Sequence, residues 1–240
     1  MENIIKTKGI LFIIINKFNI QIIKQIFYLN NENNLMKIKI CGLTTANQVQ
    51  TCINHGANYC GFILNYPKSH RFIKFEEAKK LTDIKKKETN YVGVLVNPDN
   101  DELEKFSKLN IDYFQIYGKY NNESISNIKK KFKKKIIIAI QVKNQKDVLN
   151  YKEFENSADI ILWDSSGLEC SLDWNFNWIN SVPNNITKMI AGNININKIK
   201  KILKLADIVD VSGALETNKV KDIIKIKNFL NTFKKLNNEN

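Results

Sequence analysis

The chain has 240 residues, 43% of them hydrophobic and 25% charged, which suffices for a substantial core in one large domain. Its net charge of +13 is compatible with nucleic-acid binding, but the lysines are scattered without a zinc-finger spacing or other nucleic-acid motif, and a positive field also attracts small anionic substrates. The four cysteines include no C-x-x-C pair and the two histidines form no ligand pair with them, so we expect reduced thiols in a cytosolic protein and neither disulfides nor a metal site.

Residues 1–35 are predicted to be a short N-terminal extension outside the main domain. The apolar stretch at residues 10–15 is followed by Lys17 and Lys24, so no uninterrupted segment reaches the ~20 residues that span a bilayer. No cleavage site or transit composition is present. The segment is either an amphipathic surface helix or sequence upstream of the true start. Met36, directly before the first strand, favours the second interpretation.

From Met36 onward, short apolar runs alternate with amphipathic segments that carry lysines. Helix starts agree with this pattern, because Thr45 and Gln48 form a capping box and Pro98-Asp99 opens a later helix. The predicted strands are residues 37–41, 59–64, 91–96, 113–116, 135–140, 159–163, 188–191 and 208–211. The predicted helices are residues 47–55, 75–85, 101–109, 124–132, 146–151, 195–205 and 220–230, with a weaker one at 175–180.

Eight strand–helix repeats in about 200 residues indicate parallel strands joined by helical crossovers. A doubly wound open sheet also alternates in this way, but no G-x-G-x-x-G follows the first strand. The sequence therefore predicts the α/β class and a single (β/α)₈ TIM barrel over residues 36–240. In such a barrel the chemistry lies on the loops that follow the strands.

The first predicted strand ends in a cysteine. Lys39 and Cys41 share one face, which places an ammonium group one layer below a thiol at the barrel mouth. This arrangement is expected to lower the thiol pKa from ~8.5 toward neutrality. The alternative is a small buried cysteine that packs as a hydrophobic residue.

The second strand is followed by a loop with the sole arginine of the chain, Arg71. Lysine cannot reproduce the planar, two-pronged donor of arginine, so we expect Arg71 to bind a carboxylate bidentately. That carboxylate belongs either to a ligand or to the protein itself. The adjacent His70 is expected to pack in the loop rather than to act in catalysis.

Two further strand ends carry polar side chains. Gln115 and Tyr117 share a face after the fourth strand and are positioned to donate hydrogen bonds inward, although packing inside the barrel is equally compatible with the pattern. Asp164 follows an apolar sixth strand, where poor solvation raises a carboxyl pKa toward 7; it could instead be a helix cap.

Small residues follow the last two strands. Gly192 and Asn193 come after the seventh strand, and Ser212 and Gly213 come after the eighth. Such residues let backbone N–H groups approach a ligand, and many barrels bind phosphate at these two loops. We therefore expect a small anionic ligand that carries a phosphate group.

These motifs resemble the phosphoribosylanthranilate isomerase family, from about Met36 to the last helix. The opening hexapeptide is the most specific feature, and the others support it in the same order along the chain. The matching segments are Lys39-Ile40-Cys41-Gly42-Leu43-Thr44, Gly61-Phe62-Ile63, Ser69-His70-Arg71, Gln115-Ile116-Tyr117-Gly118, Asp164 and Val209-Asp210-Val211-Ser212.

The resemblance implies a cofactor-free Amadori rearrangement in tryptophan biosynthesis, which converts N-(5′-phosphoribosyl)anthranilate to 1-(o-carboxyphenylamino)-1-deoxyribulose 5-phosphate. It implies a general base at Cys41, a general acid at Asp164 and binding of the anthranilate carboxylate by Arg71. The phosphate would lie on the loops after the last two strands, and Lys39 and Gln115 are further candidate substrate-binding residues. It also implies a cytoplasmic monomer or homodimer without nucleic-acid or membrane partners.

The sequence departs from the family pattern at several points. The family's Q-L-H-G has Tyr117 in place of histidine, the segment 165–171 before Leu172-Asp173-Trp174 is short, Asn193 replaces a glycine, and the usual S-S-G-V-E is altered after Ser212. Alternatives are another phosphosugar barrel enzyme, a barrel that binds phosphate without catalysis, or a basic nucleic-acid-binding protein. The first of these does not require a thiol after the first strand.

Overall fold

The computed structural model describes residues 35–165 and 172–239. Contacts divide the chain into the units Met1–Leu35 and Met36–Asn240, and the second contains every element below. The predictions for residues 1–34 and for the short segment 166–171 lie outside the described residues. No helix of the described part is long and apolar enough to cross a lipid bilayer.

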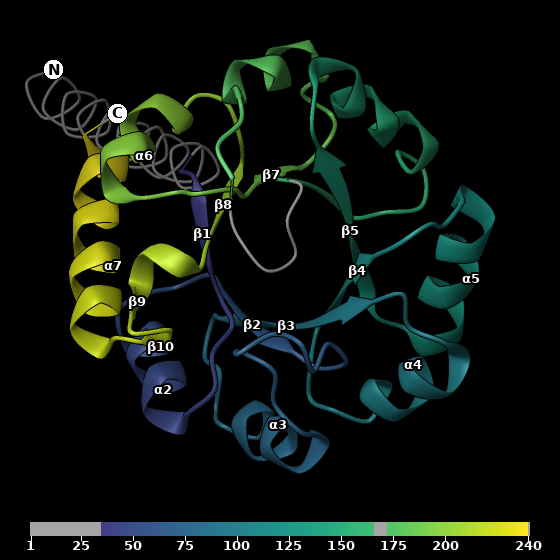
Figure 1. Ribbon diagram of the computed structural model, residues 1–240, viewed down its shortest axis with the longest axis horizontal. Helices are drawn as coiled ribbons and strands as arrows, with labels where there is room; N and C mark the ends of the chain where they lie inside the picture. The colour runs from purple at the N-terminus through teal and green to yellow at the C-terminus, as the bar shows by residue number, and fades with distance from the viewer. Residues whose placement is uncertain (1–34, 166–171, 240) are drawn as a thin grey trace, which may run out of the picture. The chain divides into compact units, whose positions relative to one another are not determined.

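Eight parallel strands form a closed barrel in the order β1 to β8, so the predicted (β/α)₈ fold is confirmed (Figure 1). Each strand pairs with its neighbours in sequence, and β1 pairs with β8 to close the sheet. The strands are β1 (Lys37–Cys41), β2 (Tyr59–Ile63), β3 (Asn90–Val96), β4 (Tyr113–Tyr117), β5 (Lys135–Val142), β6 (Ile160–Ser165), β7 (Lys188–Ile190) and β8 (Ile208–Val211).

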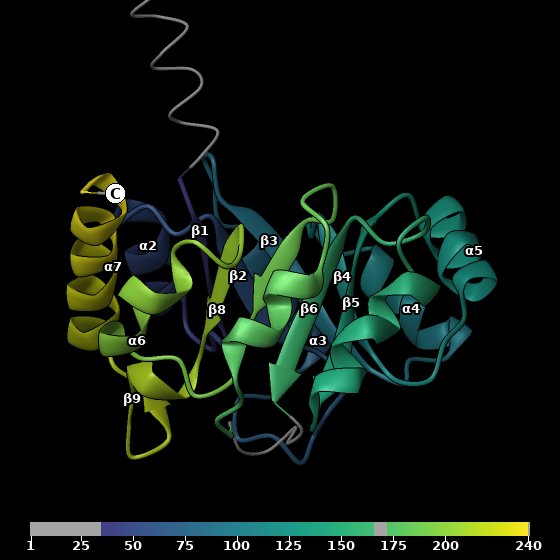
Figure 2. The ribbon, with the colours of Figure 1, turned by 90° about the horizontal axis from the view of Figure 1, so that it is seen from above.

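Helices surround the barrel (Figures 1 and 2). The Thr45–Gln48 capping box is confirmed, and Asp99 forms another with Glu102 at the start of α4. The helices are α2 (Ala46–Asn54), α3 (Phe75–Thr82), α4 (Asn100–Ser107), α5 (Asn122–Phe132), α6 (Ile196–Ile202) and α7 (Ile223–Asn238).

Two crossovers are 3₁₀ helices instead of α-helices, over Gln145–Glu153 and Phe176–Ser181. In the first, only Val148 and Tyr151 are buried, and their spacing of three residues matches the three-residue turn of a 3₁₀ helix.

The predicted start of the last helix at residue 220 was wrong. Val220–Lys221 forms the short strand β10, which pairs with β9 (Glu216–Thr217) in a hairpin after β8. Helix α7 begins only after Asp222, whose side chain accepts hydrogen bonds from the N–H groups of Ile224 and Lys225.

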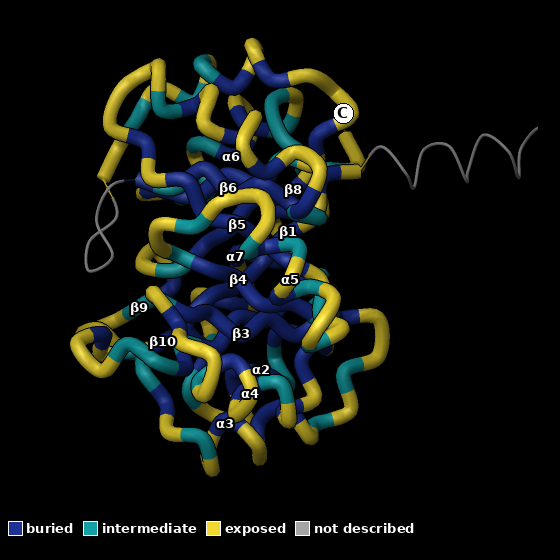
Figure 3. The backbone as a smooth tube through the Cα atoms, turned by 90° about the vertical axis from the view of Figure 1, so that its right-hand side faces the viewer, coloured by how far each residue is buried: buried dark blue, intermediate teal, exposed yellow. Residues whose placement is uncertain are grey.

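The apolar core has two layers, one inside the barrel and one between the strands and the helices. The strands are almost wholly buried, whereas exposed residues gather on loops and outer helix faces (Figure 3). One charged side chain, Lys39, lies within the barrel with no exposed surface. The fold therefore carries a buried cation directly behind the last residue of β1.

Candidate active site

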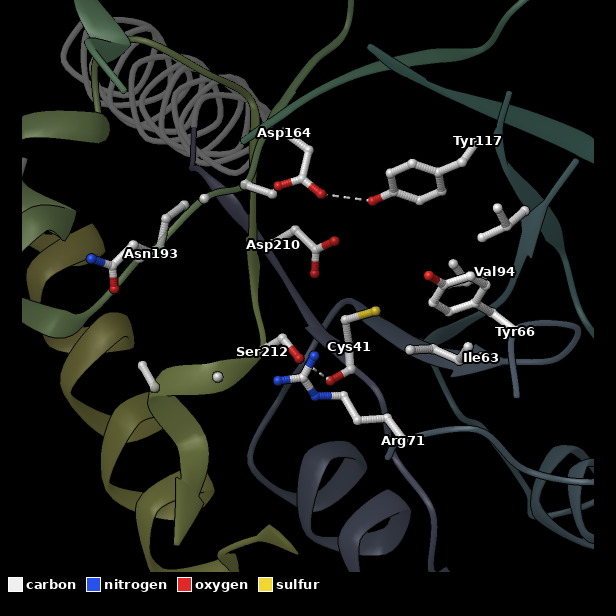
Figure 4. A pocket seen from close by; sticks show the side chains of 16 residues that line it. Cys41, Ile63, Tyr66, Arg71, Val94, Tyr117, Asp164, Asn193, Asp210 and Ser212 are labelled. Atoms are coloured by element: carbon white, nitrogen blue, oxygen red, sulfur yellow. Dashed lines mark hydrogen bonds between the residues drawn. The ribbon is translucent and has the colours of Figure 1, made fainter. Parts of the chain in front are cut away.

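A pocket of about 280 Å³ opens at the carboxyl ends of the strands (Figure 4). Seven of the predicted site residues line it together: Cys41, Arg71, Asp164, Gly192, Asn193, Ser212 and Gly213. Lys39 and Gln115 do not line it, because both are fully buried one layer below Cys41 and Tyr117 on β1 and β4. Tyr117 and Asp210 also face the pocket.

Lys39 forms a buried ion pair with Asp210, with 2.6 Å between Nζ and Oδ2. The two residues are register partners on β1 and β8, so barrel closure itself brings them together. Burial lowers the pKa of Lys39, but Asp210 and Cys41 raise it further, to about 12. Lys39 is therefore a permanent cation. The other carboxylate oxygen of Asp210, Oδ1, is buried without a hydrogen-bond partner among the described residues.

The Cys41 thiol lies close to this ion pair. A Cβ atom on Gly61 of β2 would lie 3.0 Å from Cys41 Sγ and 3.1 Å from Lys39 Nζ, so the glycine makes room for both side chains. Burial raises the pKa of the Cys41 thiol above 9.0, Lys39 lowers it, and Asp210 raises it again. The prediction that Lys39 brings the thiol pKa toward neutrality was wrong in sign, because desolvation and the nearby carboxylate outweigh the ammonium group.

Asp164, near the end of β6, has the raised pKa that its apolar strand predicts. Burial is the largest cause, and the pKa rises from 3.8 to about 6 even though a hydrogen bond from Tyr117 lowers it. The Tyr117 hydroxyl donates to Asp164 Oδ2 at 2.8 Å, and Gln115 Nε2 donates to the Tyr117 hydroxyl at 3.2 Å. The expected inward hydrogen bonds of Gln115 and Tyr117 are thus confirmed, and they end on the carboxyl group.

Arg71 makes the expected bidentate contact with a carboxylate of the protein, that of Glu216 in β9. Nε lies 2.5 Å from Oε1, and Nη2 lies 3.1 Å from Oε2. His70 bonds to the same carboxylate at 3.1 Å, and Lys221 of β10 forms a further ion pair with it. Burial raises the pKa of Glu216, but Arg71 and Lys221 lower it to about 2. Glu216 therefore stays ionised and ties the Arg71 loop to the β9–β10 hairpin.

The loops after β7 and β8 complete the pocket. Gly192 has φ +107°, and a Cβ there would approach Trp174 Nε1 to 2.9 Å, so this position requires glycine. Trp174 in turn donates to the carbonyl oxygen of Ala191 at 2.8 Å. Ser212 Oγ donates to the carbonyl oxygen of Cys41 at 3.0 Å and accepts from Lys221 Nζ at 3.2 Å. These contacts fix both loops beside the thiol.

Three charged residues at the site were not assigned roles from the sequence: Asp210, Glu216 and Lys221. Asp210 carried a signal, because it alternates with Ile208 and Ser212 and therefore points into the barrel at the mouth end of β8. Glu216 and Lys221 face each other only through the β9–β10 hairpin, which the periodicity did not predict.

The closed barrel, with a thiol, a carboxyl group and a guanidinium around one pocket at the strand ends, defines a (β/α)₈-barrel enzyme. The family model described as N-(5′-phosphoribosyl)anthranilate isomerase matches residues 38–232. A protein of this name from Streptococcus gordonii is 33% identical over 205 residues, which cover 83% of this chain and 98% of the relative. Another from Zymomonas mobilis is 30% identical, covering 76% of this chain and 90% of the relative.

Solved structures agree with the sequence comparisons. The phosphoribosyl anthranilate isomerase of Thermotoga maritima is similar with a TM-score of 0.73 and 27% identity, covering 84% of this chain and all of that one. The enzyme of Thermus thermophilus, at 20% identity and a TM-score of 0.74, supports the fold.

The chain therefore belongs to the N-(5′-phosphoribosyl)anthranilate isomerase family, as its motifs predicted. It is an isomerase that acts in tryptophan biosynthesis. It converts N-(5′-phosphoribosyl)anthranilate to 1-(o-carboxyphenylamino)-1-deoxyribulose 5-phosphate by an Amadori rearrangement.

Proposed function

We propose that Asp164 is the general acid and Cys41 the general base of this rearrangement. The observation that carries the proposal is that both side chains line one pocket (Figure 4). They come from β6 and β1, with Asp210 of β8 between them in this view. An acid and a base on different strands can act on neighbouring atoms of one bound sugar.

The first step opens the ribose ring. Asp164 donates its proton to the ring oxygen, the C1′–O bond breaks, and the nitrogen lone pair forms a C1′=N iminium. A carboxyl group with a pKa of about 6 is a stronger proton donor than water and is still partly protonated near neutral pH.

In the second step the Cys41 thiolate removes the proton from C2′. The C–H electrons form the C1′=C2′ bond, and the iminium π electrons return to nitrogen. The resulting enaminol becomes the ketone when C1′ gains a proton and the C2′ hydroxyl loses its own, so that its O–H electrons form the C2′=O bond. Burial raises the pKa of the thiol, so its thiolate is scarce but strongly basic. The iminium is the electron sink, so the mechanism that we propose uses no metal or organic cofactor.

Binding is proposed to involve both ends of the substrate. Arg71 holds the anthranilate carboxylate, and the phosphate binds the loops that carry Gly192, Asn193, Ser212 and Gly213. A solved relative, 26% identical, is in complex with reduced 1-(o-carboxyphenylamino)-1-deoxyribulose 5-phosphate, which supports a phosphosugar ligand here. Lys39 and Gln115 lie one layer beneath the pocket, where they donate hydrogen bonds to two of its residues, Asp210 and Tyr117.

We also propose that residues 36–240 form the isomerase domain and residues 1–35 an extension. The protein is proposed to act in the cytoplasm as a monomer or homodimer; a relative from Thermotoga maritima is described as dimeric. Sedimentation of the purified chain distinguishes the two states.

The test is the loss of substrate fluorescence on turnover by purified protein. We expect turnover by the wild type and a loss of at least a thousandfold for Cys41→Ala, because this change removes the base. Cys60→Ala is the matched control, since this cysteine is also buried but lies in the outer core layer. Near-normal kcat for Cys41→Ala, or equal losses for both variants, would reject the proposed base.

A further inference from the structure

Two side chains of β4 lead to the proposed acid in a chain of hydrogen bonds. Gln115 Nε2 donates to the Tyr117 hydroxyl at 3.2 Å, and the hydroxyl donates to Asp164 Oδ2 at 2.8 Å. Figure 4 shows the second bond across the pocket. Gln115 is buried and its Oε1 has no hydrogen-bond partner among the described residues, so its only side-chain hydrogen bond in the described part is the one to Tyr117.

The chain has a fixed direction. An amide nitrogen has hydrogens to give and no lone pair to accept with, so the Tyr117 oxygen is the acceptor from Gln115. The single hydrogen of the hydroxyl is then directed at Asp164. Burial raises the pKa of Tyr117 well above 10, so the phenol keeps this hydrogen throughout the working pH range. Asp164 Oδ2 consequently faces a donor at all times.

We propose that Tyr117 is a positioning residue that commits Oδ2 of Asp164 to accepting a hydrogen bond and so keeps the transferable proton on Oδ1. The inference rests on the proposed role of Asp164 as the general acid. An acid is effective only if its proton lies on the oxygen that reaches the substrate. The same bond stabilises the carboxylate that remains after proton transfer.

Tyr117 is a departure from the family motif. The family motif Q-L-H-G has histidine at this position, whereas the sequence has Gln115-Ile116-Tyr117-Gly118. A phenol differs from an imidazole because it stays protonated, and hence a donor, across neutral pH.

The groups around Asp164 shift its pKa in different directions. Asp210 of β8 raises its pKa, Lys39 of β1 lowers it, and the N–H of Ser165 also lowers it. Asp210 and Cys41 of β1 also raise the pKa of Tyr117. Of these neighbours, Tyr117 is the side chain that donates a hydrogen bond to the carboxyl group, so its removal is the specific perturbation.

The experiment titrates Asp164 directly in the full chain by ¹³C NMR of labelled aspartate carboxyls, with Asp164→Asn used to assign the signal. Tyr117→Phe keeps the ring and removes the donor, so we expect the pKa of Asp164 to rise by about one unit, the size of one hydrogen bond to a charged group. Tyr91→Phe is the matched control, because this buried tyrosine also loses one hydrogen bond, to Ile84 O at 3.0 Å, but lies away from the pocket. It is expected to leave the Asp164 titration unchanged.

The outcomes separate the inference from the function that it depends on. An unchanged Asp164 titration in Tyr117→Phe, or an equal shift in Tyr91→Phe, overturns the role of Tyr117. Wild-type kcat in Asp164→Asn overturns the proposed acid instead, whatever the titration of Tyr117→Phe. Circular dichroism and thermal unfolding of both phenylalanine variants verify that they are folded.

Discussion

Arg71 and Glu216 meet edge to edge, with Nε and Nη2 of the guanidinium bonded to the two carboxylate oxygens at 2.5 and 3.1 Å. A guanidinium offers five N–H donors in a fixed fork, so this pair occupies one edge and leaves the Nη1–Nη2 edge for another anion. Arg71 lines the pocket. The internal partner thus orients the arginine and remains compatible with a ligand carboxylate.

Replacement of Arg71 by lysine preserves the charge and removes the fork. The lysine can satisfy Glu216 or a substrate carboxylate, but it cannot bind both bidentately. We expect kcat/KM to fall ten- to a hundredfold, a loss of about 1.4 to 3 kcal/mol. Steady-state kinetics at constant ionic strength measure this loss. Parental kinetics would show that the second edge of Arg71 contributes nothing to binding.

Position 42, directly after Cys41, requires glycine because the Arg71 side chain lies against it. Its φ is +79°, and a Cβ there would lie 2.4 Å from Arg71 Cδ. Gly42→Ala is therefore expected to displace Arg71 and lower kcat/KM about tenfold or more. Gly56→Ala is the control for backbone strain, because Gly56 has φ +82° and no atom within 4 Å of the added Cβ. Equal catalytic losses in both variants would argue that strain, and not the clash with Arg71, is the cause.

Features of the fold and site that depend on neighbouring residues were predictable from the sequence, whereas those that depend on contacts between distant segments were not. Short apolar runs that alternate with amphipathic segments, bounded by caps such as Thr45, define the strands and their order, because both signals are local in sequence. The Arg71–Glu216 pair spans 145 residues and depends on an unpredicted hairpin. The sign of the Cys41 pKa shift was also inaccessible, because it depends on how completely the folded barrel removes water from the thiol.

The buried pair Lys39–Asp210 predicts a large effect on stability. Lys39→Met leaves the Asp210 carboxylate buried without its cation, so the free energy of unfolding is expected to fall by about 3 to 5 kcal/mol. The double variant Lys39→Met with Asp210→Asn removes both charges and should recover much of this loss. Urea unfolding followed by circular dichroism provides the comparison.

Lys129→Met is the matched control for this stability change. Lys129 also forms an ion pair, with Asp159 at 2.8 Å, but the two side chains are 39% and 28% exposed. Solvent screens such a pair, and its loss should cost less than about 1 kcal/mol. A similar cost for the two lysine variants would mean that burial does not set the strength of the Lys39–Asp210 pair.

The proposed acid, Asp164, has a lower pKa than the proposed base, Cys41, and this order determines the pH dependence of kcat. Reaction requires protonated Asp164, with a pKa of about 6, together with ionised Cys41, whose pKa burial raises above 9.0. Below pH 6 the acid is protonated and the thiolate increases tenfold per pH unit, so kcat rises. Between the two pKa values the gain in thiolate cancels the loss of protonated acid. The rise of kcat therefore ends near the pKa of Asp164, and its fall begins near the pKa of Cys41.

Asp164→Asn tests this assignment through the shape of the profile. The variant has no titrating acid, so its low residual kcat should keep rising with pH through the former plateau until the thiol is ionised. Asp83→Asn, at an exposed carboxyl outside the pocket, should retain the wild-type limb near pH 6. The measurement is kcat from pH 5 to 10 for the three proteins. A limb near pH 6 that survives in Asp164→Asn would assign it to another group, because removal of the titrating carboxyl must remove its limb.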